Sequence, residues 1–520
     1  MKRRGAWVLV LLGGLVACGE EFPNEPSHAL TIQVDAAFPD TLTVTDTTTF
    51  QVHISDSLGD SITGIEVNWQ SSDAAVLEVR QPSASTPLTE RLTTQAIAHG
   101  RGSAVVIVTV NRAGFAPAEL RSTVTVLERW TSIGAGASHS CAVAFSGELD
   151  CWGASLLGSG TTGSSPIPVP VAGGLTFDSV SAGIHTCALA RGTGIVYCWG
   201  QNGYGEVGNG SQFDQLTPDQ VSLGQTFQSV SAGVQYSCGL AQSGIAYCWG
   251  RDGLGQLGDF SPEGERPFPD PLLSDCDGDL TRCALTPVPV RVTKDLGQAL
   301  HFLSIDAGPR FFTCGVRTDR SAACWGKVPL VTPAIFNGFP PCEGSTCIWT
   351  VPGNHDFTSV ATGVEHACGT AGDKSVYCWG VNLFGELGRQ GPDDSTPTQV
   401  AGGRSYSQVT AGRRFTCGLT VESKVVCWGS NDLGQLGNPA SAGEPVEVQG
   451  GLEFKTLSAG FDHTCGITST GAAFCWGSNE NGQLGVDPGS ELESCGGTPC
   501  SRIPRRVREP GSVASTVGGE

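Results

Sequence analysis

The sequence is poor in methionine, in charged residues overall and in the basic residues that attract nucleic acids. It has one methionine and 15% charged residues, whereas glycine (72) and proline (30) are abundant. Such a composition suits many short strands joined by turns better than helices. Basic residues (30) are outnumbered by acidic residues (50), which gives a net charge of −20 and would repel a phosphate backbone on average. The composition predicts an all-β chain that does not bind nucleic acid.

The hydrophobic run at the amino terminus is too short to span a membrane. Basic residues at 2–4 precede an apolar run from Ala6 to Leu15, whereas a spanning helix needs about 20 residues. A basic start followed by a short apolar run is typical of an export signal. The sequence therefore predicts a signal peptide over residues 1–17.

The residues that end this signal, Leu15-Val-Ala-Cys18, resemble the bacterial lipobox. In a lipobox the signal is cut before a cysteine, whose sulfur and new amino terminus then carry acyl chains. Two acyl signals give stable membrane attachment. The resemblance implies a bacterial envelope protein, lipid-anchored to a membrane through Cys18 and facing the periplasm or the exterior. An ordinary secretory signal with an incidental cysteine is the alternative.

The chain has 21 cysteines, too many for a reducing cytosol, so an oxidising compartment and disulfide pairing are expected. Cys18 aside, the cysteines sort by spacing into long-spaced and short-spaced pairs. The long-spaced pairs are Cys141 with Cys151, Cys187 with Cys198, Cys238 with Cys248, Cys314 with Cys324, Cys368 with Cys378, Cys417 with Cys427, and Cys465 with Cys475. The short-spaced pairs are Cys276 with Cys283, Cys342 with Cys347, and Cys495 with Cys500.

The long spacing fits a disulfide across a β-hairpin. Folding the segment about Ser243 places Cys238 opposite Cys248, with Gly244 at the loop position that favours positive φ. Opposed residues on antiparallel strands lie about 4.5 to 5.5 Å apart at Cα, within the range for a disulfide. We therefore predict seven hairpin disulfides. Buried free thiols and metal ligation are the alternatives.

A longer unit recurs around these pairs. The tripeptide Cys-Trp-Gly occurs seven times, at intervals close to fifty residues. A strand such as Phe177–Gly183 precedes each pair, and a turn such as Asn202-Gly-Tyr-Gly-Glu-Val-Gly208 follows it. A unit of this length holds four short strands, about one propeller blade, and blades bury their faces only against neighbours.

The order Val-Ser-Ala-Gly, His-Thr-Cys, Cys-Trp-Gly-x-Asn and Gly-Gln-Leu-Gly resembles the regulator-of-chromosome-condensation repeat. The resemblance covers residues 129–508 and implies a seven-bladed β-propeller. Repeats one and four lack a full Gly-Gln-Leu-Gly, so their blades are expected to be shorter or distorted. Well-known family members exchange nucleotide on a nuclear GTPase and touch chromatin, but acidity and predicted export argue against either role. The resemblance extends to secreted bacterial propellers that inhibit β-lactamases, which implies use as a binding surface.

The segment before the propeller alternates apolar and polar residues in short runs, for example Phe50-Gln-Val-His-Ile54. Val67-Asn-Trp69 and the runs after it resemble bacterial immunoglobulin-like domains, which implies a β-sandwich over residues 29–128 that spaces the propeller from the membrane. Residues 18–28 are predicted to be a lipidated tether, and residues 509–520 a disordered tail.

Motifs that resemble a binding or catalytic site recur at the same position in several repeats, which indicates a structural role. Gly253–Gly258 satisfies a dinucleotide-binding pattern, but this needs a following helix, so we assign it to turns. The position two residues before the first cysteine of each pair holds a mixture, which ring packing explains better than ligation or general-base chemistry. Its members are His139, His185, Tyr236, Phe312, His366, Phe415 and His463. We predict that the protein is not an enzyme and has no cofactor. A hydrolase or lyase with a composite site at the propeller centre is the alternative.

Two features outside the repeat are candidate sites. Asp275, Asp277 and Asp279 share a loop that a disulfide between Cys276 and Cys283 would close, which suits calcium, although a solvated acidic loop is the alternative. The short-spaced cysteine pairs lie in insertions that emerge on one face. Insertions in repeats three and four carry the candidate binding rim Phe260, Phe268, Phe336, Phe339 and Trp349. Preorganised apolar side chains of this kind suit partner binding; covering their own blade edges is the alternative.

Together these features predict an envelope-anchored binding module or scaffold for a protein or glycan partner, with an inhibitor-like role as the sharper form. A regulator of a GTPase or of chromatin is a further alternative, which a cytosolic location would favour.

Overall fold

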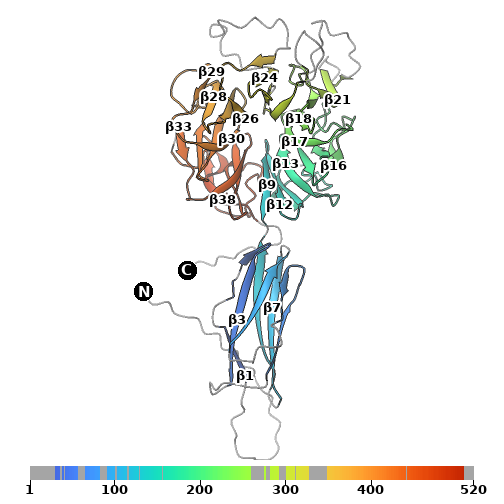
Figure 1. Ribbon diagram of the computed structural model, residues 1–520, viewed down its shortest axis with the longest axis vertical. Coiled ribbons are helices and arrows are strands. Elements are labelled where there is room, and N and C mark those ends of the chain that lie inside the picture. Colours follow the sequence, from blue (N-terminus) through green and yellow to red (C-terminus); the bar gives the residue numbers. More distant parts are fainter. Residues whose placement is uncertain are drawn as a thin grey trace, which may run out of the picture.

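The computed structural model shows two bodies, a β-sandwich and a β-propeller that follows it (Figure 1). All regular elements in the described residues are strands. No helix in this part of the chain has the length and hydropathy of a membrane span. The structure describes residues 30–34, 38–39, 41–56, 65–81, 91–99, 102–113, 116–127, 129–154, 156–258, 274–276, 282–291, 300–310, 312–326, 348–440 and 442–508.

The amino-terminal body has two four-stranded sheets. The first contains β1 (Leu30–Val34), β3 (Thr47–Asp56), β6 (Arg91–Ala98) and β5 (Leu77–Val79), and the second β2 (Thr41–Thr43), β8 (Ala118–Leu127), β7 (Gly102–Asn111) and β4 (Glu66–Ser71). Alternate residues of β7, such as Val106 and Val108, point into one apolar core. Phe50 stacks on Trp69 in this core at 6.5 Å between ring centroids. The predicted sandwich is present, and its finer assignment as immunoglobulin-like stays a prediction.

The remaining strands form seven sheets, one for each repeat, in which the first three strands run outward from the centre in chain order. In blades 3 and 7 the short strands β20 and β37 precede the fourth strand in the chain but pair on its outer side. Blade 1 contains β9 (Trp130–Ala135), β10 (His139–Ala144), β11 (Leu149–Gly153) and β12 (Ser165–Pro170); blade 2 contains β13 (Phe177–Ala182), β14 (His185–Ala190), β15 (Val196–Gly200) and β16 (Gln215–Gln220); blade 3 contains β17 (Phe227–Ala232), β18 (Tyr236–Ala241), β19 (Ala246–Arg251), β21 (Arg282–Pro289) and β20 (Ser274–Asp275).

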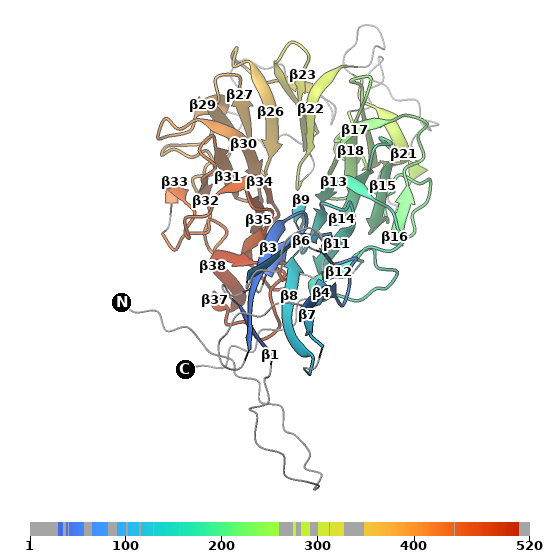
Figure 2. The same cartoon turned by 60° about the horizontal axis from the view of Figure 1, so that its bottom comes forward.

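The later blades follow the same plan around the ring (Figure 2). Blade 4 contains β22 (Phe302–Ala307), β23 (Phe312–Arg317), β24 (Ala322–Gly326) and β25 (Ile348–Thr350); blade 5 contains β26 (Phe357–Thr362), β27 (His366–Ala371), β28 (Val376–Gly380) and β29 (Asp394–Gln399); blade 6 contains β30 (Tyr406–Ala411), β31 (Phe415–Thr420), β32 (Val425–Gly429) and β33 (Ala442–Glu447); blade 7 contains β34 (Phe454–Ala459), β35 (His463–Thr468), β36 (Ala473–Ser478), β38 (Thr498–Arg506) and β37 (Glu493–Cys495).

The predicted hairpin disulfides join the second and third strands of every blade. Cys238 faces Cys248 in the register of β18 and β19 with a Cα separation of 4.1 Å, and the other six pairs match it at 4.0–4.1 Å. These six pairs are Cys141 with Cys151, Cys187 with Cys198, Cys314 with Cys324, Cys368 with Cys378, Cys417 with Cys427, and Cys465 with Cys475. The alternatives of free thiols and metal ligation are therefore wrong for all seven pairs.

The hairpin loops and the short-spaced cysteines complete this pattern. The predicted loop position has positive φ, including at the non-glycine residues Arg320, Lys374 and Ser423. Of the short-spaced pairs, Cys276 is bonded to Cys283, and Cys495 to Cys500. Cys342 and Cys347 lie outside the described residues, so their pairing stays a prediction.

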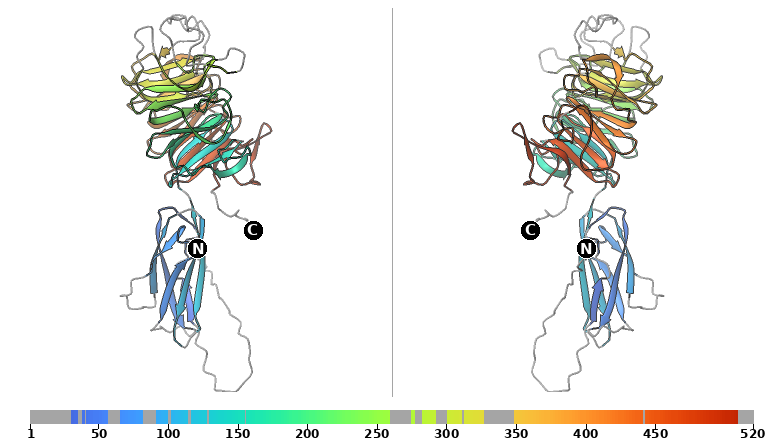
Figure 3. Two further views of the ribbon diagram at one scale, coloured as in Figure 1. Left: turned by 90° about the vertical axis from the view of Figure 1, so that its right-hand side faces the viewer. Right: turned by 90° about the vertical axis from the view of Figure 1, so that its left-hand side faces the viewer.

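The apolar core of the propeller is divided among the boundaries between blades. Each of its seven clusters takes residues from two neighbouring blades, and one of them joins blade 7 to blade 1 and so closes the ring. We call these boundaries seams and number them by their blades. The sandwich joins the propeller at the start of β9, where the Arg129 guanidinium donates to Thr45 Oγ1 at 3.0 Å (Figure 3).

Candidate functional site

The repeat motif that follows Cys-Trp-Gly fastens neighbouring blades to each other in five seams of the described residues. In seam 2–3 the carbonyl of Glu206 accepts hydrogen bonds from Trp249 Nε1 (2.7 Å) and from the Ser237 hydroxyl (3.0 Å). We call this pair of bonds the carbonyl bridge. It recurs in seams 3–4, 5–6, 6–7 and 7–1 on the carbonyls of Gln256, Glu386, Gln435 and Gln483.

The last glycine of the motif is required by this close approach. Gly208 has φ +73°, and a Cβ there would lie 2.7 Å from Trp249 Nε1. Gly258, Gly437 and Gly485 stand in the same relation to the tryptophan of the next blade. The string that resembles a dinucleotide-binding loop lies in turns, as the sequence predicts, and its last glycine packs against the next blade.

The buried histidines also join neighbouring blades. His463 Nε2 lies 2.8 Å from the Ser140 hydroxyl, which donates its own hydrogen to the carbonyl of Gln483 (3.0 Å). The His463 ring must therefore be the donor, which defines the neutral Nε2–H tautomer. His139, His185 and His366 meet a hydroxyl of the next blade in the same way, at 2.5 to 2.8 Å.

Burial keeps these histidines neutral. It lowers the pKa of His139 and of His366 to about 4, and the pKa of His185 and of His463 to about 3. A ring without charge at neutral pH, already bonded to a hydroxyl, is a structural residue. Tyr236 takes the same place in blade 3 and donates to the carbonyl of Phe312 at 2.7 Å.

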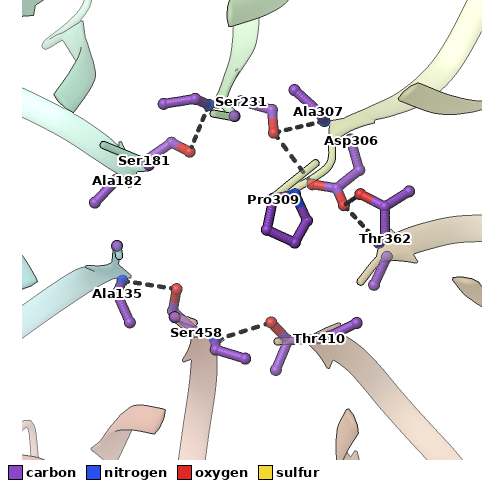
Figure 4. A pocket seen from close by; sticks show the side chains of 18 of the residues that line it. Ala135, Ser181, Ala182, Ser231, Asp306, Ala307, Pro309, Thr362, Thr410 and Ser458 are labelled. Carbon is purple, nitrogen blue, oxygen red and sulfur yellow. Dashed lines mark hydrogen bonds between the residues drawn. The ribbon is translucent and has the colours of Figure 1, made fainter. Parts of the chain in front are cut away.

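The inner strands surround a central cavity of about 220 Å³ (Figure 4). Hydroxyls of these strands accept hydrogen bonds from backbone N–H groups of the next inner strand, which we call hydroxyl bridges. Ser181 accepts from Ala232 N at 2.9 Å, and Ser231 from Ala307 N at 2.9 Å. Three further bridges of this kind join Ser132 to Val180 N at 3.3 Å, Thr410 to Ala459 N and Ser458 to Ala135 N.

Asp306 is the single ionisable residue among those that line the cavity. Its carboxylate accepts from Thr362 N (2.7 Å), from the Thr362 hydroxyl (2.6 Å) and from the Ser231 hydroxyl (3.1 Å). Burial raises the pKa of Asp306, and these hydrogen bonds oppose the shift. The carboxylate thus holds blades 3, 4 and 5 together. The cavity lining that the structure describes has no histidine, lysine or cysteine beside Asp306.

Four of the five residues of the predicted rim lie outside the described residues: Phe260, Phe268, Phe336 and Phe339. Trp349 is described: it belongs to β25, faces Cys324 in the register and packs half-buried against the cluster of seam 4–5. Trp349 therefore covers its own blade. Asp275 lies in β20, whereas Asp277 and Asp279 are outside the described residues, so the calcium site stays a prediction.

Other apolar residues are exposed in loops that the structure describes. The loops that join third and fourth strands, called outer loops here, carry Phe213 (79% exposed) and Leu383 (77% exposed). Beside Leu383, the Arg414 guanidinium lies 4.9 Å from the centroid of the Phe384 ring. These residues were missed in the sequence because only the insertions closed by disulfides were considered.

The comparisons with known proteins agree with this geometry. Two family models, both described as "Regulator of chromosome condensation (RCC1) repeat", match the chain. One matches residues 130–158, 227–256, 357–386, 406–435 and 454–483, and the other 193–240, 373–419, 423–467 and 470–519. The propeller is built of RCC1 repeats. Neither model matches the strands of blade 4, one of the two repeats expected to depart from the pattern.

Solved structures show the same fold. Yeast RCC1 (Prp20), in a crystal structure with Kap60, has a TM-score of 0.56 and 17% identity over 74% of this chain and 85% of that chain. Prp20p from Saccharomyces cerevisiae has a TM-score of 0.57 and 18% identity over 70% of this chain and 86% of that chain. Human WBSCR16 has a TM-score of 0.53 and 16% identity over 67% of this chain and 90% of that chain.

Among curated proteins, the Ultraviolet-B receptor UVR8 of Arabidopsis thaliana is 34% identical over 94 residues. The match covers 17% of this chain and 21% of UVR8, so the chain spans about a fifth of this relative's length. The RCC1 propeller is thus shared with proteins of several kinds, and the fold alone does not identify a ligand.

Proposed function

We propose that this protein is a non-enzymatic scaffold of the bacterial envelope whose RCC1 propeller binds a protein partner through its outer loops. The observation that carries this proposal is the use of the repeated polar groups. The buried histidines, the loop carbonyls and the channel carboxylate Asp306 all bond neighbouring blades. Their polar atoms maintain the ring, which leaves recognition to residues that differ from blade to blade.

The outer-loop face has the composition of a protein-binding surface. Phe213 and Leu383 are more than three-quarters exposed, and aromatic residues and arginine are enriched in the cores of protein interfaces. Phe384 under Arg414 has this arrangement. The face lies at the end of the strands opposite to the start of β9, where the sandwich joins, so a partner has access to it.

Photo-crosslinking in intact cells tests the binding face. A photoreactive amino acid replaces Phe213 or Leu383 in the outer loops, or, as controls, Phe145 or Val421 in the opposite hairpin loops. The controls are 51% and 50% exposed, so all four sites are apolar and accessible. We expect both outer-loop probes to capture the same protein and the controls to miss it. Capture by the control positions alone would contradict the proposal.

The location is tested separately. The amino-terminal pattern supports an anchor on Cys18, so Cys18→Ser should move the exported chain from the membrane fraction to the soluble fraction. Yeast Prp20p has been crystallised bound to Kap60, and its solved structure is described together with its binding to Gsp1p and histones. Predicted export argues against nuclear partners here, and a cytosolic location of the mature chain would favour them again.

A further inference from the structure

One pair of residues interrupts the repeat at the wall of the central cavity. In four other blades a serine or threonine stands at the position of Asp306 and makes a hydroxyl bridge to the next inner strand. At the position that follows, six blades have alanine, whereas blade 5 has Thr362. The Asp306 carboxylate accepts from Thr362 N and from the Thr362 hydroxyl across seam 4–5. The two exceptions to the repeat therefore form one local feature of the cavity wall (Figure 4).

A hydroxyl alone can bond neighbouring inner strands at this position. The Ser231 hydroxyl accepts from Ala307 N at 2.9 Å, and the Asp306 carboxylate accepts from Thr362 N at 2.7 Å one blade further on. A carboxylate adds a charge that is costly to hold away from water without a partner of opposite charge. The described residues that line the cavity include no lysine, arginine or histidine. Among these residues Asp306 therefore has hydrogen-bond donors but no counter-ion.

The Asp306 carboxylate has an acceptor position without a donor among the described residues. Each carboxylate oxygen can accept about two hydrogen bonds. Oδ2 accepts both bonds from Thr362, at 2.7 and 2.6 Å, whereas Oδ1 accepts from the Ser231 hydroxyl alone, at 3.1 Å. Asp306 lines the cavity, and its side chain is not fully covered. A ligand inside the cavity can therefore donate a further hydrogen bond to Oδ1.

The cavity has the size and the lining for the alkyl chain of an organic cation. Its volume of about 220 Å³ is several times that of a water molecule, which takes about 30 Å³ in the liquid. All six alanines that follow the position of Asp306 line the cavity, and their methyl groups can contact methylene groups of a ligand. A calcium ion needs about six to eight oxygen ligands. The described residues contain no group of three or more His, Cys, Asp or Glu that could hold a metal ion, so an organic cation suits the cavity better.

The cavity lies at the end of the inner strands that is nearer to the outer loops. Its lining extends to Gly136, Gly183 and Gly460, which directly follow the inner strands β9, β13 and β34. Neighbouring strands within a blade are antiparallel, as β9, β10 and β11 show. The loops after the first strand and the outer loops after the third strand therefore lie at the same end of the ring. A ligand that approaches from the outer-loop face meets this cavity first.

We propose that the central cavity binds a primary ammonium group on a short alkyl chain, with the Asp306 carboxylate as its counter-ion. An ammonium group carries only hydrogen-bond donors, which matches the open acceptor position on Oδ1. The net charge of −20 attracts cations to the protein. Two sources supply this chemistry, a free small amine and a lysine side chain of a protein. The lysine source rests on the proposed function, because the lysine arrives with a partner docked on the outer loops; the cavity site itself does not.

Calorimetric titration of the full-length oxidised protein with n-butylammonium chloride tests the site without a partner. We expect saturable binding that is at least about tenfold weaker in Asp306→Ser, because the variant removes one member of a charge pair. Serine is the residue that Ser231 supplies at this position, and its hydroxyl can still accept from Thr362 N, so the ring keeps its bond. Asp306→Asn, which keeps the shape of the side chain, should weaken binding as much. No binding by the unmodified chain, or unchanged binding by both variants, would overturn the proposal.

Glu386→Gln is the matched control. Glu386 is a buried carboxylate outside the cavity that accepts from Phe384 N at 2.8 Å, and Gln435 accepts from Leu433 N at 2.8 Å in the same place of blade 6. The control variant removes one buried carboxylate in favour of a residue from another repeat, as Asp306→Ser does. It should leave the affinity for n-butylammonium unchanged. Equal weakening in both variants would assign the effect to the net charge of the chain and overturn the proposal.

Further titrants distinguish the sources of the cation. Lysine with an acetylated amino group and an amidated carboxyl group carries the same butylammonium chain below two peptide groups. Binding of both ligands assigns the cavity to a lysine side chain, whereas binding of n-butylammonium alone assigns it to a free amine. If n-butylammonium binds but the outer-loop probes capture no protein, the cavity site stands and the proposed function fails. Binding of potassium or calcium chloride without binding of either amine would overturn the proposal.

Discussion

The sandwich and the propeller reach a stable β-structure in different ways. The sandwich buries one continuous core around Phe50 and Trp69 and has no cysteine between residues 29 and 128. The propeller has seven cores, each shared by two blades, and a disulfide in every blade. A blade alone has no closed core, so its stability depends on packing against its neighbours and on its own hairpin disulfide. The contrast indicates that disulfides occur in the propeller, whose apolar core is split into separate clusters between blades.

The largest expected difference between the two bodies follows reduction of the disulfides. The hairpin sulfurs are fully buried, so the chain is unfolded in reductant and then returned to native conditions with reductant present. Loss of a native disulfide costs roughly 2–5 kcal/mol in small secreted domains, and the seven hairpin disulfides are among those lost here. We expect hydrogen exchange to show a protected sandwich and an unprotected propeller. Refolding of both bodies would contradict this contrast.

The next largest effect concerns the single core of the sandwich. Trp69 is 1% exposed and stacks on Phe50, so Trp69→Ala should cost about 3–5 kcal/mol. Because the two cores are separate, calorimetry should show a lowered sandwich transition and an unchanged propeller transition. The control Trp152→Ala should do the opposite. A shared shift of both transitions would mean that the bodies unfold as one unit.

Acid should destabilise the propeller through its buried histidines. Their folded pKa values are lowered, so the stability they confer is complete above the unfolded pKa of about 6.5 and is lost as the pH falls through that value. For His366, with a folded pKa of about 4, the loss reaches about 3 kcal/mol at pH 4.

The variant His366→Phe places in blade 5 the residue that Phe415 already supplies in blade 6. Denaturant unfolding of the propeller between pH 7 and pH 4 should then depend less steeply on pH. An unchanged slope would show that His366 is not held neutral.

The smallest effect tests the close approach between blades. Gly437 and Gly451 both have φ +64°, but a Cβ at Gly437 would lie 2.9 Å from Trp476 Nε1, whereas nothing lies near one at Gly451. The left-handed backbone costs a side chain about 1–2 kcal/mol at either position. Overpacking should add about 1–3 kcal/mol in Gly437→Ala alone. Equal losses in thermal unfolding would show that the motif glycine serves only the backbone.

Features that depend on local spacing could be predicted from the sequence. The distance from Cys238 to Cys248 sets the hairpin register, and the loop position after Ser243 sets the sign of φ, so both could be deduced within one blade. The sequence left open whether Trp349 binds a partner or covers its own blade, because the pairing of β25 with β24 cannot be deduced from neighbouring residues. Phe213 and Leu383 were missed because exposure depends on how the outer loops pack.

Repetition along the chain specifies the number of blades, the disulfide pairs of their hairpins and the order of their strands, since each recurs about every fifty residues. How well each seam is bonded depends instead on the closed ring. His463 meets Ser140 across 323 residues, and the Gln483 carbonyl meets Trp152 across 331, only when blade 7 packs on blade 1. Whether a repeated hydrogen-bond donor has an acceptor therefore depends on the neighbouring blade, so it cannot be deduced from the sequence of one repeat.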